Sequence, residues 1–98
     1  MSAIDGMTAD ARLVILQELA RQTDARLNDR VLVRVLDTYG MSRTRDWTRT
    51  QLRALAALDA VALAEAGELL IATLRQAGRD HVDRRGVIEG VSPPADVA

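Results

Sequence analysis

The residues best suited to chemistry are four arginines in the middle of the chain. Between residues 41 and 55 they stand against a single acid, so that stretch has a net charge of +3, whereas the whole 98-residue chain carries −1. A guanidinium group presents a planar set of N–H donors that pairs with phosphate oxygens or with the edge of guanine. This local charge points to a nucleic acid partner. The arginines are Arg43, Arg45, Arg49 and Arg53.

A helix over residues 45–59 is expected to carry these side chains. Thr44 is a good N-cap, and Leu52 and Leu55 lie on the face that would turn toward a core. At about 100° per residue, the polar positions fall on the opposite side of the same helix. The residues expected to face outward are Asp46, Arg49, Thr50, Arg53 and Ala57.

These positions suggest a division of roles on double-stranded DNA. Arg49, Thr50 and Arg53 are candidates for contacts with base edges, whereas Arg43 and Arg45 near the helix start suit backbone phosphates. The alternative for the arginines is a solvated helix face with nothing bound. Asp46 could accept from a cytosine amino group or cap the helix, and Trp47 could pack as partial core or contact a partner. The candidate DNA-binding residues are Arg43, Thr44, Arg45, Asp46, Trp47, Arg49, Thr50 and Arg53.

Two helices are expected before this one. Thr8 can cap a helix over residues 9–22, and a polar connector follows at 23–27. Asn28 can cap a second helix that runs to Tyr39, where Gly40 supplies a left-handed stop. A short turn over 41–43 then leads into the arginine-bearing helix. Two helices joined by a tight turn, the second one basic, suit the major groove of DNA.

After residue 60 the pattern changes from helical to strand-like. Short apolar runs at 61–65 and 68–72, separated by Ala66 and Gly67, predict a β-hairpin. Thr73 to Gln76 matches a capping box and predicts a fourth helix to about Arg84. From Gly86 onward the chain is expected to be extended and poorly ordered unless something docks it. The predicted fold is mainly α with a short β-hairpin, a winged helix-turn-helix, with a domain at 1–86 and an extended tail at 87–98.

The sequence gives no indication of a disulfide-bonded protein, a metalloprotein, an enzyme or a membrane protein. Cysteine is absent, so disulfides and thiolate metal sites are excluded. His81 is the one histidine and is interpreted as structural, because no second ligand or nucleophile accompanies it. No convergent carboxylate pair and no glycine-rich phosphate loop is present, so neither an enzyme nor a cofactor or metal site is expected. No apolar run approaches the roughly 20 residues of a membrane span, and a cytoplasmic location is expected.

Three segments together resemble a known family. They are Arg12-Leu-Val-Ile-Leu16, the stretch from Thr44 to Ala57, and Ala72-Thr-Leu-Arg-Gln-Ala-Gly-Arg79. In order and spacing they are similar to the small winged-helix proteins of Mu-like bacteriophages, which are labelled ArsR-type by their fold. The resemblance implies a winged helix, a phage or prophage origin, a bacterial host cytoplasm and, by analogy, DNA binding.

Two positions depart from the pattern of bacterial winged-helix regulators. Ala60 stands where a glycine usually links the third helix to the wing, and the wing carries Glu65 and Glu68 in place of basic residues. An acidic wing would be repelled by a phosphate backbone.

Two hypotheses follow. The first is a sequence-specific regulator of transcription that binds double-stranded DNA as a homodimer, with the first helix, the fourth helix and the tail as places for the dimer contact. The second is an adaptor that binds a phage protein during assembly or DNA packaging, which the acidic wing, the net charge of −1 and Trp47 favour.

Overall fold

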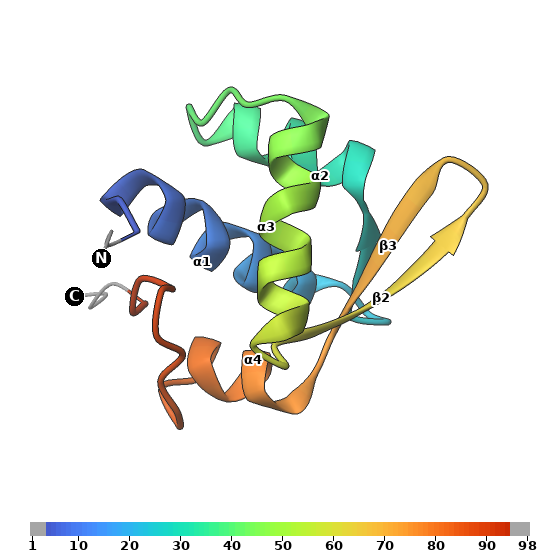
Figure 1. Ribbon diagram of the computed structural model, residues 1–98. Coiled ribbons are helices and arrows are strands. Elements are labelled where there is room, and N and C mark those ends of the chain that lie inside the picture. The colour runs from blue at the N-terminus through green and yellow to red at the C-terminus, as the bar shows by residue number, and fades with distance from the viewer. Residues whose placement is uncertain (1–3, 95–98) are drawn as a thin grey trace.

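A computed structural model describes residues 4–94 as four helices and a three-stranded antiparallel sheet (Figure 1). The strands lie in the order β1-β3-β2, so the central strand is the last one in the chain. The elements are α1 (Gly6–Arg21), β1 (Arg26–Asn28), α2 (Asp29–Thr38), α3 (Arg45–Ala57), β2 (Val61–Ala66), β3 (Leu69–Leu74) and α4 (Gln76–Val82).

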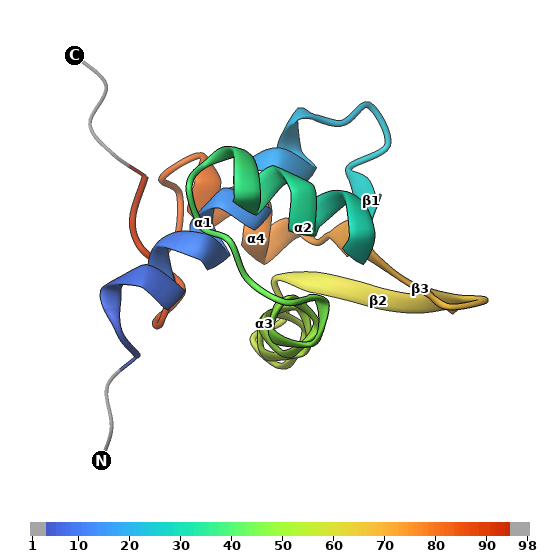
Figure 2. The ribbon, with the colours of Figure 1, turned by 90° about the horizontal axis from the view of Figure 1, so that it is seen from above.

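The core forms around α1, which contacts each of the other helices. Leu16 and Leu19 of α1 are fully buried, as are Leu32 of α2 and Leu52 of α3. Figure 2 shows α3 end-on beneath α1 and α2, with the β2–β3 hairpin projecting to one side of it. Because the apolar stripes of three helices meet at one place, the opposite side of α3 is left at the surface.

The local signals around α2 and α3 are confirmed. The side-chain oxygen of Asn28 accepts from the backbone N–H of Val31 at 3.0 Å, and that of Thr44 accepts from Trp47 at 3.0 Å. Gly40 follows α2 with φ +79°, the left-handed conformation expected of a helix-stopping residue. These contacts fix the turn between the two helices.

Two predictions in the first third of the chain were wrong. Asp5 caps α1, because its carboxylate accepts from the N–H of Thr8 at 2.7 Å; Thr8 therefore lies inside the helix. The predicted connector at 23–27 overlaps strand β1, which pairs with β3 through a register that sets Leu27 opposite Ala72. A three-residue strand has too little local pattern to be found, since its partner lies far along the chain.

The hairpin is longer than predicted. The two central turn residues are Gly67 and Glu68, and Gly67 has φ +60°, as the first position of a type II′ turn requires. Thr73 lies within β3 opposite Ala62, so the predicted capping box is wrong. The helix begins at Gln76 instead, after an N-cap that makes no side-chain bond. Pairing with two neighbouring strands outweighs the local capping signal.

The segment after Gly86 forms neither helix nor strand over the residues described, yet it packs against the domain. Ile88 and Val91 are buried members of the core. His81 joins the segment to α4: its Nδ1 accepts from the N–H of Ile88 at 3.0 Å, and its Nε2 donates to the carbonyl of Ser92 at 2.8 Å. The backbone N–H of Ser92 also donates to the carbonyl of Ala9 on α1. Residues 88–92 are thus part of the same unit as residues 4–86.

The spatial arrangement is consistent with a winged-helix-like layout. Helix α2, a short turn and α3 are followed by a hairpin that stands beside α3 (Figures 1 and 2).

Candidate nucleic-acid interface

Helix α3 presents one polar face to solvent. Asp46, Thr50 and Arg53 are exposed, as predicted, and Arg43 and Thr44 are exposed at its start. The side chain of Arg53 makes no hydrogen bond or ion pair with any residue between 4 and 94. Arg53 is therefore available to an external partner.

Arg45 and Arg49 do not lie on that face. Both turn inward, and their Nε atoms donate to the same carboxylate oxygen of Asp29, at 2.7 Å and 2.6 Å respectively. Their side chains are 30% and 26% exposed, whereas the carboxylate is fully buried. The assignment of Arg49 to a base edge is therefore corrected: its planar donor set is engaged within the molecule. The same holds for the phosphate role of Arg45.

Asp29 is the centre of this cluster. One of its oxygens accepts from both guanidinium groups, and the other accepts from the backbone N–H of Leu70 at 3.1 Å. Burial by itself would raise the pKa of Asp29, but the hydrogen bonds from Arg45, Arg49 and Leu70 hold it well below the usual range of an aspartate. The pKa of Arg45 is raised in turn by its hydrogen bond to Asp29.

The cluster joins three elements that are distant in sequence. Asp29 begins α2, the two arginines lie one turn apart on α3, and the second nitrogen of each guanidinium donates to the carbonyl of Glu68 at the hairpin turn. Leu70 lies on β3. The backbone pairing of β1 with β3 ends at Asn28, and beyond that point the side chain of Asp29 accepts the hydrogen bond from the N–H of Leu70. The orientation of the hairpin relative to α3 is therefore fixed by ionic hydrogen bonds.

Asp29 was not among the candidate residues, although a signal for it exists. It lies three residues before Leu32 and seven before Leu36, which is the spacing of one helix face, and both leucines are fully buried. An aspartate on a buried stripe requires a cationic partner.

Trp47 lies at the edge of the core. It is half-buried and packs against the core cluster, and the guanidinium of Arg43 lies 5.4 Å from the centre of its ring. Together with Ser42 and Thr44 they line an open hollow of about 410 Å³ at the start of α3. The structure thus brings the predicted residues Arg43, Thr44 and Trp47 together.

The exposed charges around α3 are of both signs. The hairpin exposes Glu65 and Glu68 and has no basic residue between positions 61 and 74. Arginines that the sequence analysis did not single out are exposed on β1 and α2, and their side chains form no ion pair within the described part of the chain. These arginines are Arg26, Arg30 and Arg34.

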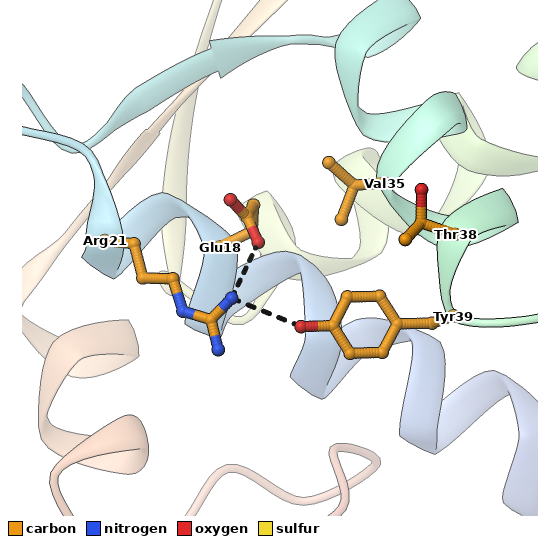
Figure 3. A pocket seen from close by; sticks show the side chains of 5 residues that line it. All are labelled: Glu18, Arg21, Val35, Thr38 and Tyr39. Carbon is orange, nitrogen blue, oxygen red and sulfur yellow. Dashed lines mark hydrogen bonds and ion pairs between the residues drawn. The ribbon is translucent and has the colours of Figure 1, made fainter.

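A second hollow, of about 320 Å³, lies between α1 and the end of α2 (Figure 3). Arg21 lies at its edge and donates to Glu18 and to the hydroxyl of Tyr39, both at 3.2 Å. Val35 and Thr38 complete the lining. The side chains of Glu18, Arg21 and Tyr39 are thus joined to one another at this hollow.

Residues 4–94 contain no group of three or more potential metal ligands. Among the same residues, no helix is both long enough and apolar enough to cross a bilayer.

The chain is similar to an uncharacterized phage protein. It is 33% identical to protein gp26 of Escherichia phage Mu over 90 residues, which span 92% of this chain and 93% of the phage protein. No protein-family model and no solved structure matches the chain.

These features define a small protein with a polar, partly basic helix held against a three-stranded sheet. The chain belongs to the family of the phage Mu protein gp26. This membership supports the predicted phage origin.

Proposed function

We propose that this protein is a phage-encoded winged-helix protein that binds double-stranded DNA through α3 and regulates transcription. The observation that carries the proposal is the exposed face of α3, where Thr50 and Arg53 stand outward while the opposite face is anchored in the core. One α-helix fits the major groove, and a rigid helix with outward polar groups can read base edges.

The Asp29 cluster supports the same proposal in a new way. A helix that reads DNA must be held at a fixed angle to its surroundings, because a small displacement breaks bidentate contacts. Arg45 and Arg49 supply that rigidity by joining α3 to α2 and to the hairpin. In this proposal they position α3, and Arg43 and Arg53 contact the DNA.

The proposal predicts a modest salt dependence. If Arg43 neutralises one phosphate while Arg53 reads a base edge, the logarithm of the affinity falls with the logarithm of salt at a slope of about −1 per chain. Fluorescence anisotropy at several salt concentrations measures this slope.

The decisive experiment is selection of bound oligonucleotides from random double-stranded DNA. An enriched site is expected, and Arg53→Ala should weaken binding to it by about 10-fold or more, the equivalent of roughly 1–3 kcal/mol. Arg85→Ala removes an exposed arginine outside α3 and serves as the control. Failure to enrich any site would contradict sequence-specific binding.

A second candidate function is an adaptor that binds a phage protein. The acidic hairpin favours it, because Glu65 and Glu68 would face a phosphate backbone if the hairpin approached DNA. Passage over heparin separates the two functions: a DNA-binding protein is retained at moderate salt, and an adaptor with this net charge is not.

A further inference from the structure

The segment that follows α4 is attached to the domain by a small set of contacts. Ile88 and Val91 place their side chains in the core, and the backbone N–H of Ser92 donates to the carbonyl of Ala9 on α1 at 3.1 Å. Residues 86–94 form no strand and no helix. They can therefore leave the surface of α1 and α4 in a local opening that breaks neither the sheet nor a helix.

His81 holds this segment through both of its ring nitrogens. Its side chain is 2% exposed, its Nδ1 lies 3.0 Å from the backbone nitrogen of Ile88, and its Nε2 lies 2.8 Å from the carbonyl oxygen of Ser92. A backbone N–H can only donate, and a carbonyl can only accept. Nδ1 must therefore be unprotonated and Nε2 must carry the hydrogen, so the attached segment selects the neutral imidazole in one tautomer.

A second proton on the ring is incompatible with these contacts. It would go to Nδ1 and oppose the N–H of Ile88, so that two donors would face one another. The buried N–H would lose its acceptor, and an imidazolium would be buried without an anion. Within residues 4–94, no carboxylate forms an ion pair with His81.

The charged groups around His81 include two of the same sign as an imidazolium. Arg84 and Arg85 line a hollow of about 430 Å³ together with the ring. Asp10 on α1 is the carboxylate that bonds to the segment, where it accepts from the hydroxyl of Ser92 and not from the ring. The other charged side chains that bond to the segment, belong to it or flank the ring in the chain are Arg12, Arg79, Asp80, Asp83 and Glu89.

We propose that residues 86–94 form a strap that opens when His81 gains a proton. The closed strap excludes the second proton and the open strap admits it, so proton uptake drives opening by linkage. An imidazole in water gains its proton near pH 6.5. The equilibrium constant for opening should therefore be constant above about pH 6.5 and should rise about tenfold for each pH unit below it.

Opening exposes a surface that the closed strap covers. Ile88 and Val91 leave the core, and Arg12 on α1 loses its hydrogen bond to the carbonyl of Gly90. Arg12 is buried in the closed form and has no ion pair among the described residues. The surface uncovered on α1 therefore combines apolar area with a cation. This inference does not depend on the proposed binding of DNA.

Amide hydrogen exchange of the full chain between about pH 8 and pH 5 tests the proposal. The readout is the protection factor, which corrects each amide for the effect of pH on its intrinsic exchange rate. Protection at Ile88 and Ser92 should fall about 30-fold from pH 7.5 to pH 5. At pH 7.5 it should already be lower than the protection of Leu52 within α3. Equal protection of Ile88 and Leu52 would mean that the segment opens only when the whole protein unfolds, which overturns the proposal.

Two variants separate the ring from the carboxylate that bonds to the strap. His81→Gln can still accept from Ile88 and donate to Ser92 but gains no proton, so protection should become independent of pH. Asp10→Asn keeps an oxygen acceptor for the hydroxyl of Ser92 and should retain the wild-type pH dependence. The imidazole ¹⁵N chemical shifts of the wild type, which need no variant, should show the Nε2–H tautomer at pH 7.5.

Four results would overturn the proposal. They are constant protection of the strap in the wild type, a pH dependence that persists in folded His81→Gln, its loss in folded Asp10→Asn, and the opposite tautomer of the ring. The first and the last are measured on the wild type, so the proposal stays testable if a variant does not fold.

Discussion

Asp29 shows how a single buried charge can determine the roles of the side chains around it. Read along the sequence, Arg45 and Arg49 belong to a row of cations that could meet a phosphate backbone. In the fold they surround a carboxylate that no water reaches, and they share it with the backbone of β3. Two of the four arginines in residues 41–55 are therefore structural, which halves the positive charge that α3 can offer to a partner.

Asp29→Ala should destabilise the protein by about 3 kcal/mol, because it leaves two guanidinium groups and the N–H of Leu70 without their acceptor. Chemical denaturation measures this change. Asp37→Ala, on the exposed side of the same helix, should lie within about 0.5 kcal/mol of the wild type. Equal effects of the two substitutions would show that the cluster contributes little to stability.

The same carboxylate predicts a pH dependence. Its pKa in the folded protein is lowered, whereas in the unfolded chain it stays near about 3.9. The unfolded state therefore binds the proton first as the pH falls, so the stabilisation is complete above about pH 5 and declines below it. The difference in unfolding free energy between wild type and Asp29→Ala should shrink between about pH 5 and pH 2. A constant difference across that range would contradict this assignment.

Gly78 is a second residue whose role depends on a distant neighbour. A Cβ atom built there would lie 2.5 Å from the carbonyl oxygen of Ala60 and 2.7 Å from a methyl group of Leu74. Gly78→Ala should destabilise the protein by about 1–3 kcal/mol, although alanine favours a helix. Gly86→Ala, where the nearest atom is 3.5 Å away, is the matched control in thermal denaturation. A stabilised Gly78→Ala variant would contradict the close approach of α4 to Ala60.

At the scale of elements, the sequence predicts correctly the helix ends that depend on hydrogen bonds between residues close together in the chain. Asn28, Thr44 and Gly40 fix the ends of α2 and the start of α3 through bonds within three residues, and each was found from the sequence. Strand β1 was missed because its partners in β3 lie more than forty positions along the chain, and the end of β3 was missed because the capping signal at Thr73 overlaps it. The prediction that the side chain faces outward is correct for Arg53 and wrong for Arg49. A helical wheel does not reveal a partner on another helix.

Arg49 and Arg53 should therefore give opposite phenotypes. Arg49→Ala should lower stability by about 1–3 kcal/mol through loss of a charged hydrogen bond to Asp29. Arg53→Ala should leave stability within about 0.5 kcal/mol of the wild type, because no described residue pairs with its side chain. Thermal denaturation of the two proteins checks this. A larger loss in Arg53→Ala than in Arg49→Ala would overturn the division of roles.

At the scale of the whole molecule, the segment after α4 belongs to the domain. The sequence after Gly86 has glycine, proline and no helical period, so nothing local indicates order. Order comes from burial of Ile88 and Val91 and from the two ring nitrogens of His81, which hold the segment against α1 and α4. Lone residues that complete a core at long range are the part of a fold that sequence patterns describe least well.

Ile88→Ala should destabilise the protein by about 2–4 kcal/mol, as expected for a large-to-small change at a buried position. Val87→Ala is the control, because Val87 is the neighbour of Ile88 in the chain and is exposed. Calorimetry should show a lower unfolding temperature for Ile88→Ala alone. Equal midpoints for both variants and the wild type would mean that the segment does not contribute to the core.

The bond between Ser92 and Ala9 brings the two ends of the described chain together on α1. A circular permutant becomes feasible for that reason: a linker can lead from the segment after Ser92 back to the start of α1, and new ends can be opened in the turn at Ser42 between α2 and α3. Such a protein would keep the Asp29 cluster and the sheet while α2 and α3 lose their direct covalent link. Retention of the fold in that permutant would mean that side-chain contacts alone dock α3 onto α2.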